Sequence, residues 1–163
     1  MLSNLKIILK SKLFYSFILI IFLIPFVYEK LPIRIDMTQQ SSLPQELWIT
    51  YSDISLEKDY VLFTPPQSKY IANKDVKYLK KIACKEDDWL RVDEYGQYYC
   101  NNNLIGRANK VDGNNKEIEN FKFNGIIPKD KIFVVGTHPL SHDSKYFGFV
   151  DKSQIIRKAT PLF

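Results

Sequence analysis

Acidic residues and arginine are missing from the first 28 residues of the chain, whereas Lys6, Lys10 and Lys12 are present. Behind these lysines, residues 13–28 form an apolar run in which Ser16 is the one clearly polar side chain. The run lacks a polar face at helical spacing, which argues against the buried core helix of a domain. As a helix it would measure roughly 24 Å, close to the ~30 Å of a hydrocarbon core. The sequence therefore predicts a transmembrane anchor at residues 13–30, preceded by a basic segment at residues 1–12.

Small residues in the pattern of a signal-peptide cleavage site are also missing beyond the apolar run. A cleaved secretory signal needs them there, but the bulky and charged stretch Tyr28-Glu29-Lys30-Leu31-Pro32 follows instead. These flanks favour an uncleaved anchor over a cleaved signal. Because the lysines precede the span, the N-terminus is predicted to be cytoplasmic. The expected location is a membrane, with residues 31–163 as an extracytoplasmic domain.

Cysteine and histidine are scarce, with two residues of each. No histidine is close in sequence to Cys84 or Cys100, so a zinc site is a poor explanation for the cysteines. We expect no metal and no cofactor. Outside the cytoplasm an even pair of cysteines favours a disulfide, and two buried free thiols are the alternative. A disulfide would close a loop of about 17 residues and stabilise the fold by roughly 3 kcal/mol.

The charge of the chain does not indicate nucleic-acid binding. The net charge is +5 and the isoelectric point is about 9.1, but three of the basic residues are the lysines that precede the apolar run. Without them, 20 basic and 18 acidic residues remain, a net charge of +2. Nucleic-acid binding would need a clustered basic face. The expected partner at this point is the membrane, and the sequence does not indicate an oligomeric state.

Internal repeats, low-complexity tracts and a long amphipathic helix are absent after the anchor, and residues 67–73 suggest at most a weak turn. Short apolar segments rich in β-branched and aromatic residues alternate with turn-like clusters, which is typical of β-proteins. These segments are residues 47–51, 60–64, 76–84, 89–92, 97–100, 104–108, 131–136, 146–150 and 154–159. The predicted fold class is mainly β: an all-β domain preceded by one N-terminal transmembrane helix.

Lys80 is an unexpected residue on an apolar strand face. In a strand over residues 76–84, Lys80 shares a face with Tyr78, Ile82 and Cys84, whereas Lys81 lies on the opposite face. Burial would lower the pKa of Lys80 from about 10.4 toward the range in which a lysine can act as a base. The alternative is a lysine whose stem packs while its ammonium reaches solvent.

Two further segments complete a resemblance to a known family. Ser42-Leu43-Pro44 resembles the S-x-P nucleophile box of bacterial type I signal peptidases, and Leu79-Lys80-Lys81-Ile82-Ala83 resembles their lysine box. The stretch from Ser141 to Gly148, with Asp143-Ser144-Lys145, resembles their C-terminal S-x-D-S-R-x-[FW]-G box. The small size, the single span and segments such as Phe133-Val134-Val135-Gly136 are most similar to the conjugative-transfer (TraF-like) branch.

The resemblance implies an all-β signal-peptidase-like catalytic domain and a serine endopeptidase with a Ser/Lys dyad. Ser42 would be the nucleophile and Lys80 the general base. The Ser42 backbone N–H and the Gln40 side chain would stabilise the oxyanion. Ser141 would hold Lys80 in place, and Asp143 would pair with Lys145. The substrate would be a pilin or another secreted precursor, cleaved on the periplasmic or extracytoplasmic side of the bacterial inner membrane.

Several positions depart from the family pattern. Glu46 stands where glycine is usual, Thr137 replaces an aspartate, and Lys145 replaces an arginine. A housekeeping signal peptidase is one competing function, but such enzymes usually carry the missing glycine and aspartate, which weighs against it. A catalytically inactive scaffold subunit is the other, and Glu46 and Thr137 keep it open. His138 and His142 could also suggest a Ser-His-Asp triad or a zinc helix. Asp143 is poorly placed to orient the adjacent His142, and Pro139 argues against a helix. Two solvated loop histidines are the expectation.

Overall fold

The computed structural model describes residues 12–38, 42–55, 57–68, 71 and 76–162, and the chain divides into two compact units, Met1–Arg34 and Ile35–Phe163. The first unit contains helix α2 (Lys12–Lys30), which has the length and composition of a membrane span, with a mean hydropathy of 1.8. None of its residues is buried. A helix that is apolar all round and uncovered is suited to a lipid environment. The helix agrees with the predicted anchor to within one residue.

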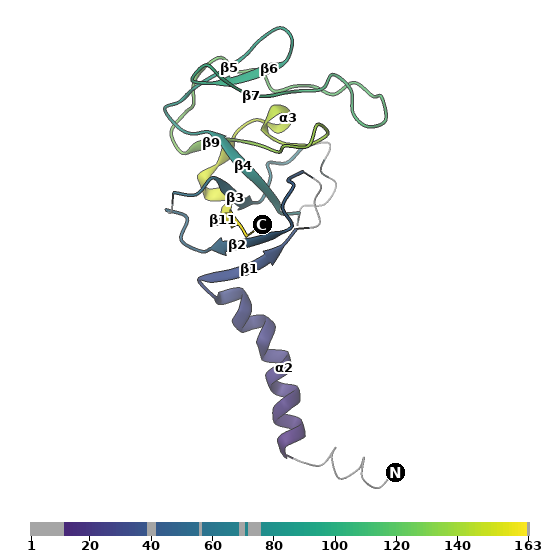
Figure 1. The fold of residues 1–163 in the computed structure, drawn as a ribbon, viewed down its shortest axis with the longest axis vertical. Coiled ribbons are helices and arrows are strands. Elements are labelled where there is room, and N and C mark those ends of the chain that lie inside the picture. The colour runs from purple at the N-terminus through teal and green to yellow at the C-terminus, as the bar shows by residue number, and fades with distance from the viewer. Residues whose placement is uncertain (1–11, 39–41, 56, 69–70, 72–75, 163) are drawn as a thin grey trace. The chain divides into compact units, whose positions relative to one another are not determined.

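The second unit is built from two β-sheets (Figure 1). The larger sheet has seven strands in the order β1-β2-β11-β3-β4-β9-β10. Their bounds are β1 (Ile33–Met37), β2 (Leu47–Tyr51), β3 (Tyr60–Phe63), β4 (Tyr78–Cys84), β9 (Lys131–Val135), β10 (Val150–Asp151) and β11 (Ile155–Pro161). The smaller sheet, in the order β7-β6-β5-β8, consists of β5 (Trp89–Val92), β6 (Gln97–Cys100), β7 (Asn103–Arg107) and β8 (Gly125–Ile126). The predicted fold class, mainly β after one apolar helix, is confirmed.

Strand β4 is central to the large sheet because it pairs with β3 on one side and β9 on the other. Val61 of β3 lies opposite Lys80, and Val135 of β9 lies opposite Lys81. The buried apolar residues around these strands form separate clusters, one containing Val61 and Ile82 and another containing Leu43 and Leu79. Lys80 therefore shares its strand face with the buried Val61 and Ile82, whereas Lys81 on the opposite face is exposed.

The alternation predicted for β4 holds until its last residues. The pairing with β9 shifts register between Ile82 and Cys84, so one extra residue is accommodated at Ala83. A bulge of this kind interrupts the regular alternation of faces. Cys84 accordingly packs with Leu90 rather than with Ile82, contrary to the predicted common face.

The predicted strand at residues 146–150 is wrong. The short helix α3 (Ser144–Phe147) occupies the first part of this segment, and only Val150 belongs to a strand. Asp143 caps the helix by accepting a hydrogen bond from the Lys145 N–H, and Gly148 ends it with φ of +82°. A carboxylate cap and a glycine at the exit both favour a helical turn. A 3₁₀ turn, η1 (Lys152–Gln154), similarly replaces the start of the predicted strand at 154–159.

A disulfide between Cys84 and Cys100 connects the end of β4 with the end of β6, and the Cα atoms are 5.7 Å apart. It therefore joins the large sheet to the small one. Replacing both cysteines with alanine should lower the free energy of unfolding by about 3 kcal/mol, mainly because the unfolded chain gains freedom. Chemical denaturation of the purified protein checks the value. Alkylation of both thiols in native, unreduced protein would contradict the disulfide.

Candidate active site

Lys80 is buried in the middle of β4, with 3% of its surface exposed, whereas its neighbour Lys81 is exposed. The Lys80 Nζ donates a hydrogen bond of 3.0 Å to the Ser141 Oγ. It also lies 5.3 Å from the centre of the Tyr78 ring. Burial lowers the pKa of Lys80 to about 8, although the negative charge of Asp143 opposes this shift. A substantial neutral fraction is therefore available to Lys80 near pH 8.

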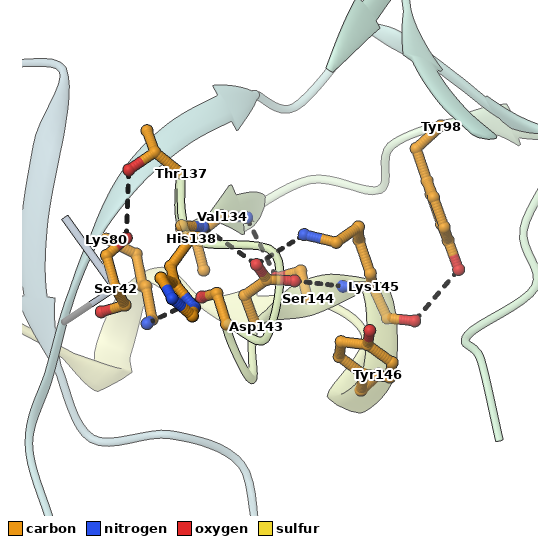
Figure 2. A network of polar contacts seen from close by, with 12 residues as sticks. Ser42, Lys80, Tyr98, Val134, Thr137, His138, Asp143, Ser144, Lys145 and Tyr146 are labelled. Atoms are coloured by element: carbon orange, nitrogen blue, oxygen red, sulfur yellow. Dashed lines mark hydrogen bonds and ion pairs between the residues drawn. The ribbon is translucent and has the colours of Figure 1, made fainter. Parts of the chain in front are cut away.

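Ser42 is also buried, with 8% of its surface exposed, and its carbonyl oxygen is tightly held. That oxygen accepts hydrogen bonds from the Thr137 N–H at 2.9 Å and the Thr137 Oγ1 at 3.3 Å. The Ser42 hydroxyl oxygen has no hydrogen-bond partner among the residues that the structure describes. Figure 2 shows the Ser42 and Lys80 side chains directed toward the same space. The backbone of Ser42 is thus fixed while its hydroxyl is available.

Gly136 is the point at which the serine and lysine segments meet. A Cβ atom added there would lie 2.1 Å from the Ser141 Oγ and 2.9 Å from the Ser42 carbonyl oxygen. Since Ser141 accepts the hydrogen bond from Lys80, the structure brings Ser42, Lys80 and Ser141 together around one glycine. These residues are separated by up to 99 positions in the chain.

Asp143 is fully buried and organises the turn that follows Ser141. Figure 2 shows its contacts with Lys145. Its carboxylate forms an ion pair of 2.6 Å with the Lys145 Nζ and accepts a hydrogen bond of 2.9 Å from the Gly136 N–H. It also accepts a hydrogen bond of 3.1 Å from the Lys145 backbone N–H. A buried carboxylate needs such compensation. These contacts tie α3 to the end of β9 and so position the loop that carries Ser141.

The other residues singled out from the sequence have different outcomes. Gln40 lies outside the described residues. His138 is exposed, as expected, and its Nδ1 accepts the Leu140 N–H at 3.1 Å. The expectation for His142 is wrong because its ring is half-buried and stacks on the Tyr146 ring, with centroids 5.8 Å apart. Tyr146 follows His142 by four positions, where the loop becomes helical, and this spacing could have indicated the contact.

Three supporting residues were missed by the sequence analysis. Tyr98 is fully buried and donates a hydrogen bond from its hydroxyl to the Lys145 carbonyl oxygen at 3.0 Å. The Ser144 Oγ accepts the Val134 N–H at 3.0 Å. Thr137 was noted only as a departure from the family pattern, yet it supplies two of the hydrogen bonds to the Ser42 carbonyl. No local pattern marks these contacts, because each depends on how distant segments approach.

The cysteines do not offer a metal site. The sulfur atoms of Cys84 and Cys100 and a carboxylate oxygen of Asp88 lie within 4.8 Å of one another. Both sulfurs are in the disulfide, so they are not thiolates and cannot act as the ligands that zinc requires.

Substituting Gly136 with alanine should disrupt the site. The new methyl group would overlap Ser141 and the Ser42 carbonyl, so the loop must move, and overpacking of this kind typically costs 1–3 kcal/mol, here about 2 kcal/mol. We expect a lower melting temperature. Gly113→Ala is the matched control, since nothing lies within 4 Å of the position of its added Cβ. Equal effects of the two substitutions would contradict the packing described here.

Comparison with known proteins identifies a family. The family model described as "Signal peptidase, peptidase S26" matches residues 6–163. A signal peptidase I from Buchnera aphidicola subsp. Schizaphis graminum (strain Sg) is 31% identical over 147 residues, which cover 83% of this chain and 42% of that protein. The chain therefore spans less than half the length of this curated relative.

A crystal structure of a signal peptidase I from Enterococcus faecalis V583 is also similar, with a TM-score of 0.43 and 18% identity over 64% of this chain and 97% of that chain. The family assignment does not depend on this structural similarity, because the family model extends over nearly the whole sequence. The chain belongs to the signal peptidase family, peptidase family S26.

Proposed function

We propose that the chain is a membrane-anchored serine endopeptidase that removes signal or leader segments from precursor proteins beside the membrane. The observation that carries the proposal is the buried Lys80, whose Nζ hydrogen-bonds to Ser141 and whose pKa burial lowers to about 8. A lysine is seldom buried without a function or a charged partner. Ser42, whose carbonyl oxygen and the Ser141 side chain both approach Gly136, would supply the nucleophile, because its hydroxyl has no hydrogen-bond partner among the described residues.

The mechanism follows from the protonation of these two groups. Neutral Lys80 accepts the proton of the Ser42 hydroxyl as the oxygen attacks the scissile carbonyl carbon. The resulting lysine ammonium then gives this proton to the leaving amine as the peptide bond breaks. Water, deprotonated by the same lysine, hydrolyses the Ser42 ester and releases the acyl product. The hydrogen bond to Ser141 keeps the Lys80 Nζ in position throughout.

The developing oxyanion requires hydrogen-bond donors. The Ser42 backbone N–H is one proposed donor, and the Gln40 side chain is the other by analogy with the family. A donor of this kind typically contributes about 3 kcal/mol to transition-state stabilisation. Thr137 supports this role indirectly, because its hydrogen bonds to the Ser42 carbonyl fix the orientation of the Ser42 backbone.

The identity of the precursor is the more specific part of the proposal. The resemblance to the conjugative-transfer branch favours a pilin or another secreted precursor of a conjugation apparatus. Membership of the signal peptidase family is equally compatible with a housekeeping enzyme that processes many exported proteins. Cleavage of one pilin-like precursor alone would favour the former, and cleavage of many export precursors would favour the latter.

Co-expression of a candidate precursor with the full chain tests the activity. We expect the wild type to convert the precursor to the mature size, and Ser42→Ala to leave it uncleaved. Ser41→Ala is the matched control, since it removes the neighbouring hydroxyl and should have little effect. Cleavage that persists unchanged in a folded Ser42→Ala variant would point to a non-catalytic scaffold role.

The proposed topology places the N-terminus in the cytoplasm and the β-domain outside it. The basis is the lysine-rich segment before α2 and the absence of acidic residues there, because positive flanks remain on the cytoplasmic side. A reporter that is active only in the cytoplasm, fused after residue 163, should be silent. The same reporter fused after Lys12 should be active. Strong activity of the first fusion would contradict this orientation.

A further inference from the structure

A pocket of about 410 Å³ lies at the smaller sheet, whose strands β5, β6 and β7 are labelled in Figure 1. It is enclosed by the turn between β5 and β6, the segment that follows β7 and the segment that precedes β8. Ser42, Lys80 and Ser141 are not among its lining residues, so the proposed mechanism assigns no role to it. Its volume is in the range of small-molecule sites, roughly 300–1,000 Å³.

Most of the lining is polar and carries both signs of charge. The polar lining residues are Asp93, Glu94, Lys110, Asn120, Lys122 and Asn124. The two carboxylates and the two ammonium groups cancel in formal charge. A ligand without net charge, but with many hydrogen-bonding groups, therefore suits the pocket better than an anion or a cation.

Two asparagine side chains provide unused hydrogen-bonding groups of opposite kind. The Asn120 Oδ1 is buried and has no hydrogen-bond partner among the described residues, and an unpaired buried carbonyl costs free energy. The Asn124 Oδ1 accepts the Val92 N–H at 2.9 Å, so the Asn124 amide hydrogens are the part that is left for a ligand. The pocket thus combines an acceptor on one asparagine with donors on the other.

The turn between β5 and β6 forms a preorganised wall of the pocket. The Asp93 Oδ1 accepts the Tyr95 N–H at 3.0 Å and the Gln97 N–H at 2.9 Å. Gly96 has φ of +75°, and a Cβ atom added there would lie 3.9 Å from the Asn120 Nδ2. A larger side chain at this position would therefore crowd Asn120. A wall that is fixed before binding lowers the entropic cost of holding a ligand.

An exposed aromatic ring adds an apolar surface to this polar pocket. Tyr95 lines the pocket with 64% of its surface exposed, whereas the other lining residues, Val92, Gly96 and Ala108, are partly or fully buried. The electron-rich face of an aromatic ring attracts groups with positive partial charge, such as polarised C–H bonds. The ligand should therefore combine polar edges with an apolar face.

We propose that this pocket binds an N-acetylated amino sugar, with N-acetylglucosamine as the unit that it accommodates. The sugar has no net charge, and its hydroxyl groups both donate and accept hydrogen bonds. The C–H face of its ring would pack on Tyr95. Its acetamido group would donate its N–H to the Asn120 Oδ1 and accept a hydrogen bond from the Asn124 Nδ2. An extended peptide also donates and accepts, but it offers Tyr95 no flat C–H face. This inference is independent of the proposed peptidase function.

An NMR titration of the full-length wild type tests the pocket directly. The protein carries ¹⁵N-labelled asparagine and is kept in a detergent without a sugar headgroup. The probe is methyl N-acetyl-β-D-glucosaminide, and the side-chain amide signals of Asn120 and Asn124 are followed. We expect both signals to shift, with binding at about 1 mM. Methyl β-D-glucoside lacks the acetamido group and should bind about tenfold more weakly, because the asparagine amides then remain unpaired.

Two substitutions should weaken the acetylated sugar about tenfold each, which corresponds to about 1.4 kcal/mol. Tyr95→Ala removes the aromatic face. Asn124→Asp keeps an acceptor for the Val92 N–H but loses the amide donor. Trp89→Ala is the matched control, because Trp89 is an exposed aromatic residue of the same sheet, 49% against 64% for Tyr95, that does not line the pocket.

Several outcomes would overturn the proposal. They are the absence of any shift at about 50 mM sugar, far above the expected affinity, equal binding of the glucoside, and equal weakening by Tyr95→Ala and Trp89→Ala. Stronger binding of N-acetyl-L-alanine amide would identify a peptide site instead. Precursor cleavage by Tyr95→Ala should stay within about twofold of wild type. If the wild type cleaves no precursor, the peptidase proposal fails, and the sugar titration still decides the pocket.

Discussion

Replacing Lys80 with alanine is expected to abolish precursor cleavage, whereas Lys81→Ala should leave the rate within about twofold of wild type. The two lysines are adjacent in sequence, but Lys80 is buried and Lys81 is exposed. Without a base, the Ser42 hydroxyl is a weak nucleophile, and loss of general base catalysis alone typically costs about 10² to 10⁴ in rate. Lys81→Ala removes one surface charge and is therefore the matched control.

Lys80→Arg should be as inactive as Lys80→Ala, although it retains the positive charge. A guanidinium stays protonated in proteins and cannot accept the serine proton. In the wild type, activity should increase with pH through a midpoint near 8, the pKa to which burial lowers Lys80. The neutral, proton-accepting form increases above this pH. Rates of purified variants measured from pH 6 to 10 check both expectations, and near-normal cleavage by a folded Lys80→Ala protein would end the dyad hypothesis.

The same burial makes Lys80 unfavourable for stability. A pKa near 8 instead of 10.5 means that the folded state disfavours the ammonium by about 3 kcal/mol, at 1.36 kcal/mol for each pH unit. The unfolded chain binds the proton more tightly, so this penalty is fully present below pH 8 and decreases as the pH rises toward 10.5. Lys80→Met should consequently be inactive but no less stable than wild type at pH 7. A purely structural role for Lys80 would instead predict a loss of stability.

The sequence alone was sufficient where a prediction depends only on the alternation of side chains along one strand. The alternation of faces in β4 separates Lys80 from Lys81, and this required only the period of a strand. The alternation failed at Cys84 because pairing with β9 introduced a bulge. Helix α3 was mistaken for a strand because the aromatic content of Tyr146, Phe147 and Phe149 outweighed the cap formed by Asp143.

Strands β1 and β8 were missed for a different reason. β1 is exposed on alternate residues and includes Arg34 and Asp36, and β8 has only two residues. β8 is too short to show a pattern, whereas β1 alternates apolar and charged side chains with a strand period that was missed. The contacts of Thr137 and Tyr98 around the site are tertiary, since both donate to backbone carbonyls that are far away in the sequence.

Removing the Asp143 carboxylate is expected to have the largest effect on stability. In Asp143→Ala the Lys145 ammonium, whose side chain is 5% exposed, loses its partner at 2.6 Å. The Gly136 and Lys145 N–H groups lose their acceptor as well. An uncompensated buried charge typically costs 3–5 kcal/mol, so we expect a loss of about 4 kcal/mol in the free energy of unfolding. Chemical denaturation at pH 7 measures it.

Two variants separate the charge effect from general disruption. Asp143→Asn combined with Lys145→Met removes both charges and should be clearly more stable than Asp143→Ala, because no unpaired charge remains buried. Asp151→Ala breaks the Lys131 ion pair, also 2.6 Å long but between side chains that are 37% and 36% exposed, and should have a much smaller effect because solvent screens it. If Asp143→Ala and Asp151→Ala lowered the free energy of unfolding equally little, the buried ion pair would not be what holds the Ser141 loop in place. In that case the position of Ser141, and with it that of Lys80, would have to be maintained by the packing of Gly136 against Ser141 and Ser42 instead.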